Sequence, residues 1–243
     1  MTAVDLGLGP PRRSIEELQA VTEQAQRIFA DEADPIELLL WFGQRLSVSK
    51  VAVAVSFSDG VMAFLAARAL PGVDVLFGDT GYHFAETLGL RDAVAGTQPV
   101  NVRSLTPQLT VAQQDDTYSK DLWKTDPDSC CAMRKTAPMD QALRQYEAWA
   151  TGLRRNDHEG RAKIPLIQWD EKHEMIKVNP IAAYTDADIN GTIQQYGILE
   201  NPLRQVGYKS VGCEPCTRPV EDGEDDRAGR WAGNQKMECG MHI

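Results

Sequence analysis

The sequence predicts an α/β fold built on a doubly wound, mostly parallel sheet, and three observations support it. Two short apolar runs rich in β-branched residues, 51–55 and 73–77, have the composition of strands buried on both faces. A polar, glycine-containing loop follows each run, and a helical pattern of apolar residues follows each loop. This alternation of strand, loop and helix is typical of folds that bind ligands beyond the carboxyl ends of their strands.

The remaining elements follow in the order that such a fold requires. Capping-box patterns at residues 14–17 and 34–37 predict two amphipathic helices before the first strand. A C-terminal segment, residues 207–243, is rich in Gly, Asp, Glu and Arg and is expected to be mobile behind a domain of residues 1–206. The other expected elements are helices at 61–70, from the 78–81 loop to about 95, at 133–146 and at 185–196, and strands at 98–102, 148–153 and 175–178.

Composition excludes several classes of function. The 243 residues carry a formal charge of −10, which argues against binding to DNA, RNA or anionic lipid, because those partners need a dense basic face. No apolar run approaches the about 20 residues that span a bilayer, and the N-terminus lacks the order of a signal peptide. We therefore expect a cytoplasmic protein with no membrane or nucleic-acid partner. An anionic ligand then requires positive charge gathered locally.

The loop after the first predicted strand is suited to an anion. Ser56 and Ser58 lie between that strand and a helix N-terminus, where backbone N–H groups and two hydroxyls favour an anionic oxygen. The alternative is that these residues only form a polar turn. If the loop binds an anion, the Asp59 carboxylate must point away from that anion or be offset by a cation. Asp79 follows the second strand at the same sheet edge, so both loops are expected to serve one ligand.

Positive charge gathers between Cys130 and Lys163. This stretch has seven basic and four acidic residues, a local net of +3 in a protein of −10. Arg154 and Arg155 follow a predicted strand end, where guanidinium groups can bind phosphate or sulfate bidentately. The alternative is ordinary alternation of surface charge.

The five cysteines divide into four and one. In a reducing compartment they are better explained as ligands or reactive thiols than as disulfides. Cys130 and Cys131 are adjacent, and Cys213 and Cys216 form a Cys-x-x-Cys pair 82 residues beyond Cys131. Four thiolates suit a structural zinc ion or an iron–sulfur cluster, and adjacent cysteines, which differ from zinc-ribbon spacing, favour the cluster. Lys135 lies close to Cys131 in sequence, so its positive charge would offset the negative charge of such a cluster. Buried cysteines with no shared ligand are the alternative.

Cys239 is the remaining cysteine, and it lies close to the C-terminus. It follows Cys216 by 23 residues, so a mobile segment could carry it to any part of the domain. Arg227 and Arg230 lie on the same segment. A mobile thiol with nearby cations can close over a bound anion and attack it. The alternative is an incidental free thiol.

Taken together, these motifs resemble the assimilatory adenylyl sulfate reductases, the cluster-bearing branch of the adenylyl and phosphoadenylyl sulfate reductase family. The resemblance covers most of the chain from about Val51 to its end. It rests on Ser-Phe-Ser at 56–58, Leu76 to His83, Cys130-Cys131 with Arg134-Lys135, Thr151 to Arg155, Lys177 to Pro180, Gly212 to Cys216, Gly229 to Trp231, and Glu238 to His242.

The resemblance implies a fold, a cofactor and a mechanism. The fold is akin to the adenine nucleotide α-hydrolases, with Ser56 and Ser58 in the phosphate-binding loop. The implied ligands of a 4Fe-4S cluster are Cys130, Cys131, Cys213 and Cys216. Cys239 would attack the sulfur of adenylyl sulfate, AMP would leave, and thioredoxin would release sulfite from the S-sulfocysteine. A homo-oligomer is compatible with this interpretation.

Expected substrate-binding residues are Ser56, Ser58, Asp79, Lys135, Arg154, Arg155, Arg227, Arg230 and His242.

Three other functions remain as alternatives. A phosphoadenylyl sulfate reductase shares the tail cysteine but typically lacks the four cluster ligands. A tRNA-thiolating relative with the same fold is disfavoured by the charge of −10 and the absence of a basic stripe. A non-catalytic module, in which the four cysteines hold zinc and Cys239 is idle, belongs to a different class altogether.

Overall fold

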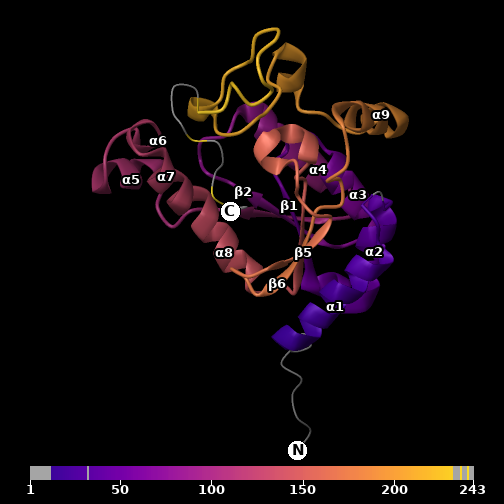
Figure 1. Ribbon diagram of the computed structural model, residues 1–243. Coiled ribbons are helices and arrows are strands. Elements are labelled where there is room, and N and C mark those ends of the chain that lie inside the picture. The colour runs from indigo at the N-terminus through magenta and orange to yellow at the C-terminus, as the bar shows by residue number, and fades with distance from the viewer. Residues whose placement is uncertain (1–11, 32, 232–235, 237–239, 241–243) are drawn as a thin grey trace, which may run out of the picture.

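The computed structural model describes residues 12–31, 33–231, 236 and 240, which form a six-stranded sheet with helices on both faces (Figure 1). The strand order is β3-β2-β1-β4-β6-β5, and every neighbouring pair is parallel except β5 with β6. This confirms the predicted doubly wound, mostly parallel sheet. The strands are β1 (Val51–Val55), β2 (Asp74–Gly78), β3 (Asn101–Leu105), β4 (Ala148–Thr151), β5 (Ile167–Asp170) and β6 (Met175–Val178).

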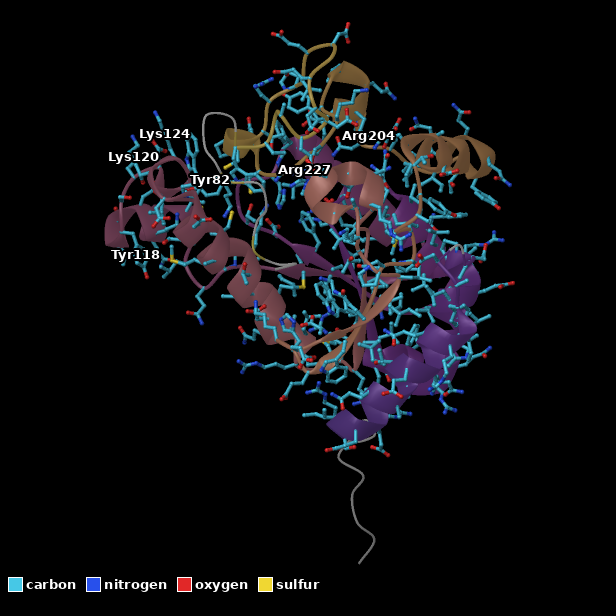
Figure 2. All side chains as sticks on the ribbon, viewed as in Figure 1. Tyr82, Tyr118, Lys120, Lys124, Arg204 and Arg227 are labelled. Carbon is cyan, nitrogen blue, oxygen red and sulfur yellow. The ribbon has the colours of Figure 1, made fainter. Side chains whose placement is uncertain are left out.

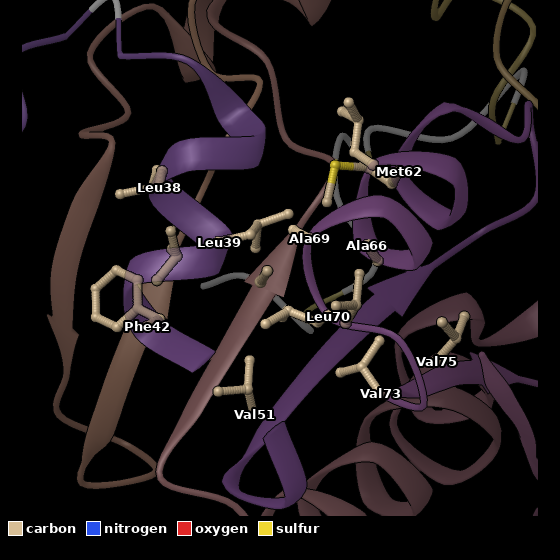
Figure 3. Packing of buried hydrophobic residues seen from close by; sticks show 14 of the residues in the cluster. Leu38, Leu39, Phe42, Val51, Met62, Ala66, Ala69, Leu70, Val73 and Val75 are labelled. Atoms are coloured by element: carbon tan, nitrogen blue, oxygen red, sulfur yellow. The ribbon is translucent and has the colours of Figure 1, made fainter. Parts of the chain in front are cut away.

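Two cores, one on each face, hold the sheet between its helices. The larger core packs α1, α2 and α3 against one face, and Figure 3 shows Leu38 and Phe42 of α2 beside Val51 of β1. The smaller core packs α8 against the other face through Leu143 and Trp149. The α-helices in the described residues are α1 (Ile15–Ile28), α2 (Pro35–Leu46), α3 (Val61–Ala69), α4 (Ala85–Thr97), α5 (Val111–Thr117), α6 (Leu122–Thr125), α7 (Pro127–Cys131), α8 (Ala137–Leu143) and α9 (Asp186–Tyr196).

Helix boundaries follow the capping residues. Ser14 and Glu17 form both halves of a capping box at α1, as do Thr185 and Asp188 at α9. At α2 only one half forms, because Asp34 accepts hydrogen bonds from two backbone N–H groups without a return bond. The capping signals therefore located the starts of all three helices.

The structure differs from the predicted elements in several places. Helices α5 and α6 were not predicted, and β3 begins at Asn101 instead of at residue 98. Strand β5 was not predicted, and the predicted helix at 133–146 is the later part of a longer helical run from Pro127 to Leu143. A π-helical turn, Ala132–Thr136, interrupts that run. Pro138 has no N–H to donate to the carbonyl of Arg134, and its ring would press on that carbonyl in a regular helix. The widened turn accommodates the proline, and such turns recur at functional sites.

The chain order creates a crevice at the carboxyl edge of the sheet. From β1 the chain proceeds to β2 and β3 on one side, and it returns to β4 on the other side of β1. The loops after β1 and β4 therefore diverge, and ligands of such sheets bind between them. Residues 207–231 lie at this edge (Figure 1), where Val211 and Tyr208 pack against Phe84.

The described residues include no helix that is long and apolar enough to cross a bilayer.

Candidate active site

The loop after β1 is anchored by a phenylalanine in an uncommon conformation. Phe57 has a φ of 54°, in the left-handed region, and its side chain is buried against Phe77 with ring centroids 5.3 Å apart. Its carbonyl accepts a hydrogen bond of 3.0 Å from the Asn201 side chain. The hydroxyls of Ser56 and Ser58 lie 3.1 Å apart. Anchoring Phe57 in the core thus presents two hydroxyls together at the sheet edge, as the sequence predicted for an anion-binding loop.

A cavity of about 230 Å³, which we call the carboxyl-edge cavity, opens beside this loop. Its walls include the ends of β1 and β4 and part of the 207–231 segment, so it occupies the crevice that the topology creates. Figure 2 shows Arg204 and Arg227 at this end of the molecule. The predicted substrate-binding residues in its lining are Ser56, Ser58, Lys135, Arg154, Arg227 and Arg230.

The cavity lining reverses the charge of the protein. Seven basic and three acidic side chains line it, a formal net of +4 in a chain of −10. Such a lining suits an anionic ligand. Arg161, Arg204 and Lys209 contribute to this charge, and the sequence analysis did not identify them as ligand-binding residues. They belong to short helical turns and loops with no motif of their own, so only the fold brings them here.

Carboxylates in the lining and beside it hold two of the arginines in place. Asp157 pairs with Arg154 at 2.9 Å and with Arg161 at 2.5 Å. Asp186 pairs with the other side of the Arg154 guanidinium at 2.7 Å. Because both arginines already have fixed partners, they reach the cavity with little freedom left to lose on binding an anion.

Asp59 lies beside the serine loop and is offset by a cation. Its carboxylate accepts a hydrogen bond from the N–H of Val61 and lies 3.6 Å from the Arg204 guanidinium. Burial raises the pKa of Asp59, while the Val61 hydrogen bond and the charge of Arg204 oppose that rise. Asp59 therefore has, in Arg204, the neighbouring cation that the sequence analysis expected an anion-binding loop to need.

Two predicted substrate-binding residues lie outside the cavity lining. Arg155 donates to the carbonyl of Ile164 at 2.8 Å and to Asp31 at 2.9 Å. Asp79 accepts from the N–H of Gly81 at 3.2 Å and from Arg91 at 3.0 Å. Both side chains stabilise local structure at the rim of the sheet. Two neighbours in sequence, Arg154 and Arg155, thus point to different surroundings.

His83 lines the carboxyl-edge cavity as a neutral side chain. Burial lowers its pKa to about 4, and its ring packs on Phe77 with centroids 4.6 Å apart. Its Nε2 lies 2.9 Å from the carbonyl of Gly78, which can only accept, so Nε2 carries the proton. Its motif was part of the family resemblance, but the sequence did not assign the residue a role.

The four cysteines of the sequence prediction meet at a second cavity, which we call the thiol cavity. Cys130, Cys131, Cys213 and Cys216 all line it, although two come from α7, one ends a short helical turn at Glu214–Cys216, and Cys213 directly precedes that turn. The turn is fixed by a backbone bond of 2.7 Å from Glu214 to Tyr82 and by one of 2.9 Å from Trp231 to Cys216. Tertiary folding therefore joins two pairs that are far apart in sequence.

The thiols raise each other's pKa. Burial raises the pKa of Cys130 to about 12, with further contributions from the other three cysteines. Burial and the neighbouring thiols raise the pKa of Cys216 to about 11, and Lys135 and Arg230 only partly oppose this. Cys130 and Cys216 are therefore protonated at neutral pH in the protein alone, and a metal group that binds them must displace their protons.

The side chains that could bind a metal group in the thiol cavity are its four cysteines. No three His, Cys, Asp or Glu side chains among the described residues are close enough to bind a single metal ion. An iron–sulfur cluster has a different requirement, because each cysteine binds a different iron atom and the four sulfurs surround the cluster. Cys213 also has a neighbour typical of cluster sites, since the Thr80 hydroxyl lies 3.2 Å from its sulfur. The four thiols that line this cavity equal in number the ligands that a 4Fe-4S cluster takes.

Three residues form a wall between the two cavities. Lys135, Arg230 and Trp231 line both. Arg230 donates to the Ser210 hydroxyl at 3.2 Å and lies 4.6 Å from the Trp231 ring centroid. Two cations thus lie where they can act on an anion in one cavity and on thiolates in the other. Cys239 and His242, both predicted to act on the substrate, lie outside the described residues.

Comparisons with known proteins give a consistent result. Residues 50–219 match the phosphoadenosine phosphosulfate reductase domain family. The chain is 51% identical to the adenosine 5'-phosphosulfate reductase of Streptomyces coelicolor over 100% of both chains. It is 48% identical to that of Mycolicibacterium smegmatis over 93% of this chain and 95% of the relative. A phosphoadenylyl-sulfate reductase from Candida auris shares the fold, with a TM-score of 0.68 and 22% identity over 87% of this chain and 100% of that one.

Proposed function

Because this chain belongs to the phosphoadenosine phosphosulfate reductase family, we propose that it reduces adenylyl sulfate to sulfite and AMP in sulfate assimilation, with thioredoxin as the electron donor. The observation that carries the proposal is the wall of Lys135 and Arg230 between a cationic cavity and four cysteines. The relatives named adenosine 5'-phosphosulfate reductases support the substrate without a 3′-phosphate.

The reaction we propose has two steps. The Cys239 thiolate attacks the sulfur of the sulfate group, the bond from that sulfur to the bridging oxygen breaks, and AMP leaves with the electron pair. A thioredoxin thiolate then attacks Cys239 Sγ and releases sulfite. The second thioredoxin thiol resolves the mixed disulfide, so the two electrons that reduce the sulfate group come from the thioredoxin dithiol.

The residues of the carboxyl-edge cavity supply electrostatic stabilisation. An anionic thiolate attacking an anionic substrate accumulates charge in the transition state, and preorganised cations offset it. Lys135, Arg154 and Arg230 line the cavity and can do so, and Ser56 and Ser58 can donate hydrogen bonds to the phosphate. Neutral His83 adds no charge.

We propose that the four cysteines of the thiol cavity hold a 4Fe-4S cluster. When bound, the cluster joins the two cysteine pairs and places a charged group beside Lys135 and Arg230. Reduced thiols of this kind persist in the cytoplasm, where we place the protein. A zinc-binding module without catalysis is the competing function, and iron and acid-labile sulfide analysis of anaerobically purified protein distinguishes the two.

The test is a matched pair of incubations with radiolabelled adenylyl sulfate and phosphoadenylyl sulfate. We expect label on Cys239 only from adenylyl sulfate, and we expect Cys239→Ser to abolish both labelling and sulfite release while it retains iron. Sulfite formation by that variant would refute the assignment of the nucleophile. Label from phosphoadenylyl sulfate alone would identify the other substrate.

A further inference from the structure

The serine loop, residues 56–58, depends on a backbone conformation that is unfavourable by itself. Phe57 has a φ of 54°, and a residue with a Cβ stays in this left-handed region only where its surroundings hold it. Ser56 and Ser58 flank Phe57, so the backbone angles of Phe57 set the direction of one hydroxyl relative to the other. The separation of 3.1 Å between the two hydroxyl oxygens therefore depends on what holds Phe57.

A single buried amide binds the carbonyl of Phe57. The Asn201 side chain belongs to a residue that is 0% exposed, and its Nδ2 donates at 3.0 Å to that carbonyl and at 3.0 Å to the Thr87 hydroxyl of α4. Its Oδ1 accepts at 3.1 Å from the N–H of Leu203. Because this N–H can only donate and the Phe57 carbonyl can only accept, the partners fix the orientation of the amide. Both N–H groups and the oxygen of the amide are thus engaged.

The chain around Asn201 lies alongside the residues that follow the serine loop. The N–H of Gly60 donates to the carbonyl of Leu199 at 3.0 Å, and Asp59 and Glu200 form an antiparallel bridge. A Cβ on Gly60 would lie 2.7 Å from the Leu199 carbonyl oxygen, so this close approach requires glycine. The pairing brings the Asn201 amide to the serine loop.

From these contacts we propose that Asn201 is a positioning residue, which holds Phe57 in its left-handed conformation and so keeps the two serine hydroxyls together for an anion. Its effect on substrate binding rests on the proposed function, whereas its effect on the loop does not. Asn201 is not part of the carboxyl-edge cavity lining, so it acts through the loop and not by contact with the substrate. An anion site that is already ordered avoids the cost of ordering it on binding.

Hydrogen exchange tests the loop without reference to activity. The hydroxyl of Asn201→Ser can still accept from the N–H of Leu203, but it ends one bond short of Nδ2 and loses the donor to Phe57. We expect amide exchange of residues 56–60, in the full chain purified anaerobically, to be about tenfold faster than in the wild type, because a buried carbonyl loses its partner. Equal exchange in the wild type and Asn201→Ser would overturn the proposal.

The matched control is Thr87→Val, which removes the other hydrogen bond of the same amide and retains the bond to Phe57. Exchange of residues 56–60 should then change by less than about twofold. We expect both variants to lower Tm by about 2–4 °C, since each loses one buried hydrogen bond. Acceleration of exchange to the same extent in Thr87→Val would overturn the specific role of the Phe57 contact.

Substrate binding tests what the amide does for the anion site. We expect Asn201→Ser to raise KM for adenylyl sulfate and Kd for AMP about tenfold each, with kcat lowered less than about threefold and iron content unchanged. Thr87→Val should leave KM and Kd unchanged despite its lower Tm, which separates loop positioning from overall stability. Unchanged KM and Kd in Asn201→Ser would overturn the role in binding. Failure of the proposed function would instead show as no sulfite from the wild type, with the exchange result unaffected.

Discussion

The carboxyl-edge cavity and the thiol cavity lie on either side of Lys135, Arg230 and Trp231, and they differ in how their polar groups are satisfied. In the first, ion pairs fix the charged groups, as Asp157 does for Arg154. In the second, burial and then the neighbouring thiols raise the pKa of Cys130 to about 12. Carboxylates fix individual arginines of the first cavity, while its lining as a whole keeps a formal net charge of +4. In the second cavity the thiols of Cys130 and Cys216 stay protonated at neutral pH unless a metal group displaces their protons.

This difference implies that the two cavities respond differently to mutation. A change in the carboxyl-edge cavity should alter substrate affinity and leave metal content unchanged. A change in the thiol cavity should remove the metal group and, through the shared wall, also disturb the substrate side. The predictions below separate these effects.

The largest effect is expected from Cys216→Ser. Loss of one of four thiolates should remove most of the iron and acid-labile sulfide and lower the rate of sulfite formation by about 100-fold or more. Cys239→Ser is the matched control, since it should lose activity with iron retained. Metal analysis of both variants, purified anaerobically, measures the contrast. Full iron content in Cys216→Ser would remove this residue from the ligand set.

A smaller effect, on KM for adenylyl sulfate, is expected from Arg154→Gln. The control is Arg155→Gln, the same substitution at the next residue. Arg154 lines the carboxyl-edge cavity, so its loss should raise KM for adenylyl sulfate about tenfold to 100-fold, the value of a charge-assisted contact. Arg155 contacts Asp31 and Ile164 outside the cavity, so KM should change less than about twofold. Both variants should retain iron. Equal increases in KM would place Arg155 at the substrate.

The sequence predicted the fold because local patterns determine most of it. The apolar run Val51–Val55 and the capping residues Ser14 and Thr185 each specify an element with little help from the rest of the chain. Strand β5 was missed because a four-residue edge strand containing Gln168 and Asp170 has no buried-strand pattern. The π-helical turn was missed because its cause, Pro138, predicts only a helix boundary or kink.

The site was less predictable because much of it depends on tertiary structure. The cysteines could be grouped from their spacing, and the structure brings all four to one cavity. Arg161 and Arg204 reach the carboxyl-edge cavity only through the folding of distant segments. The adjacent arginines 154 and 155 look equivalent in sequence, and only the direction of each side chain separates them. The predicted family is confirmed by relatives that match the full chain.

The smallest effect concerns the helical run that connects the thiol cavity to the opposite end of the sheet. Helix α8 continues the helical run whose first helix, α7, ends with Cys130 and Cys131, and its Asp140 accepts from His173 at 2.9 Å. The other ring nitrogen of His173 lies 2.8 Å from Asp170 at the end of β5. The hydrogen bond to Asp170 raises the pKa of His173, burial opposes this, and Asp140 adds to the rise, while Lys172 pairs with Asp140 at 3.1 Å.

A histidine with a raised folded-state pKa stabilises the protein only while it is protonated. Its contribution is complete below the unfolded pKa of about 6.5 and is lost as the pH rises through the higher folded pKa. We therefore expect His173→Asn to lower the free energy of unfolding by about 0.5–1 kcal/mol at pH 5.5 and by less at pH 9, measured by urea denaturation. A difference independent of pH would show that His173 does not act through its charge. Since His173 touches neither cavity lining, iron content and KM should both be unchanged, which would separate stability at the far end of the helical run from the chemistry at its start.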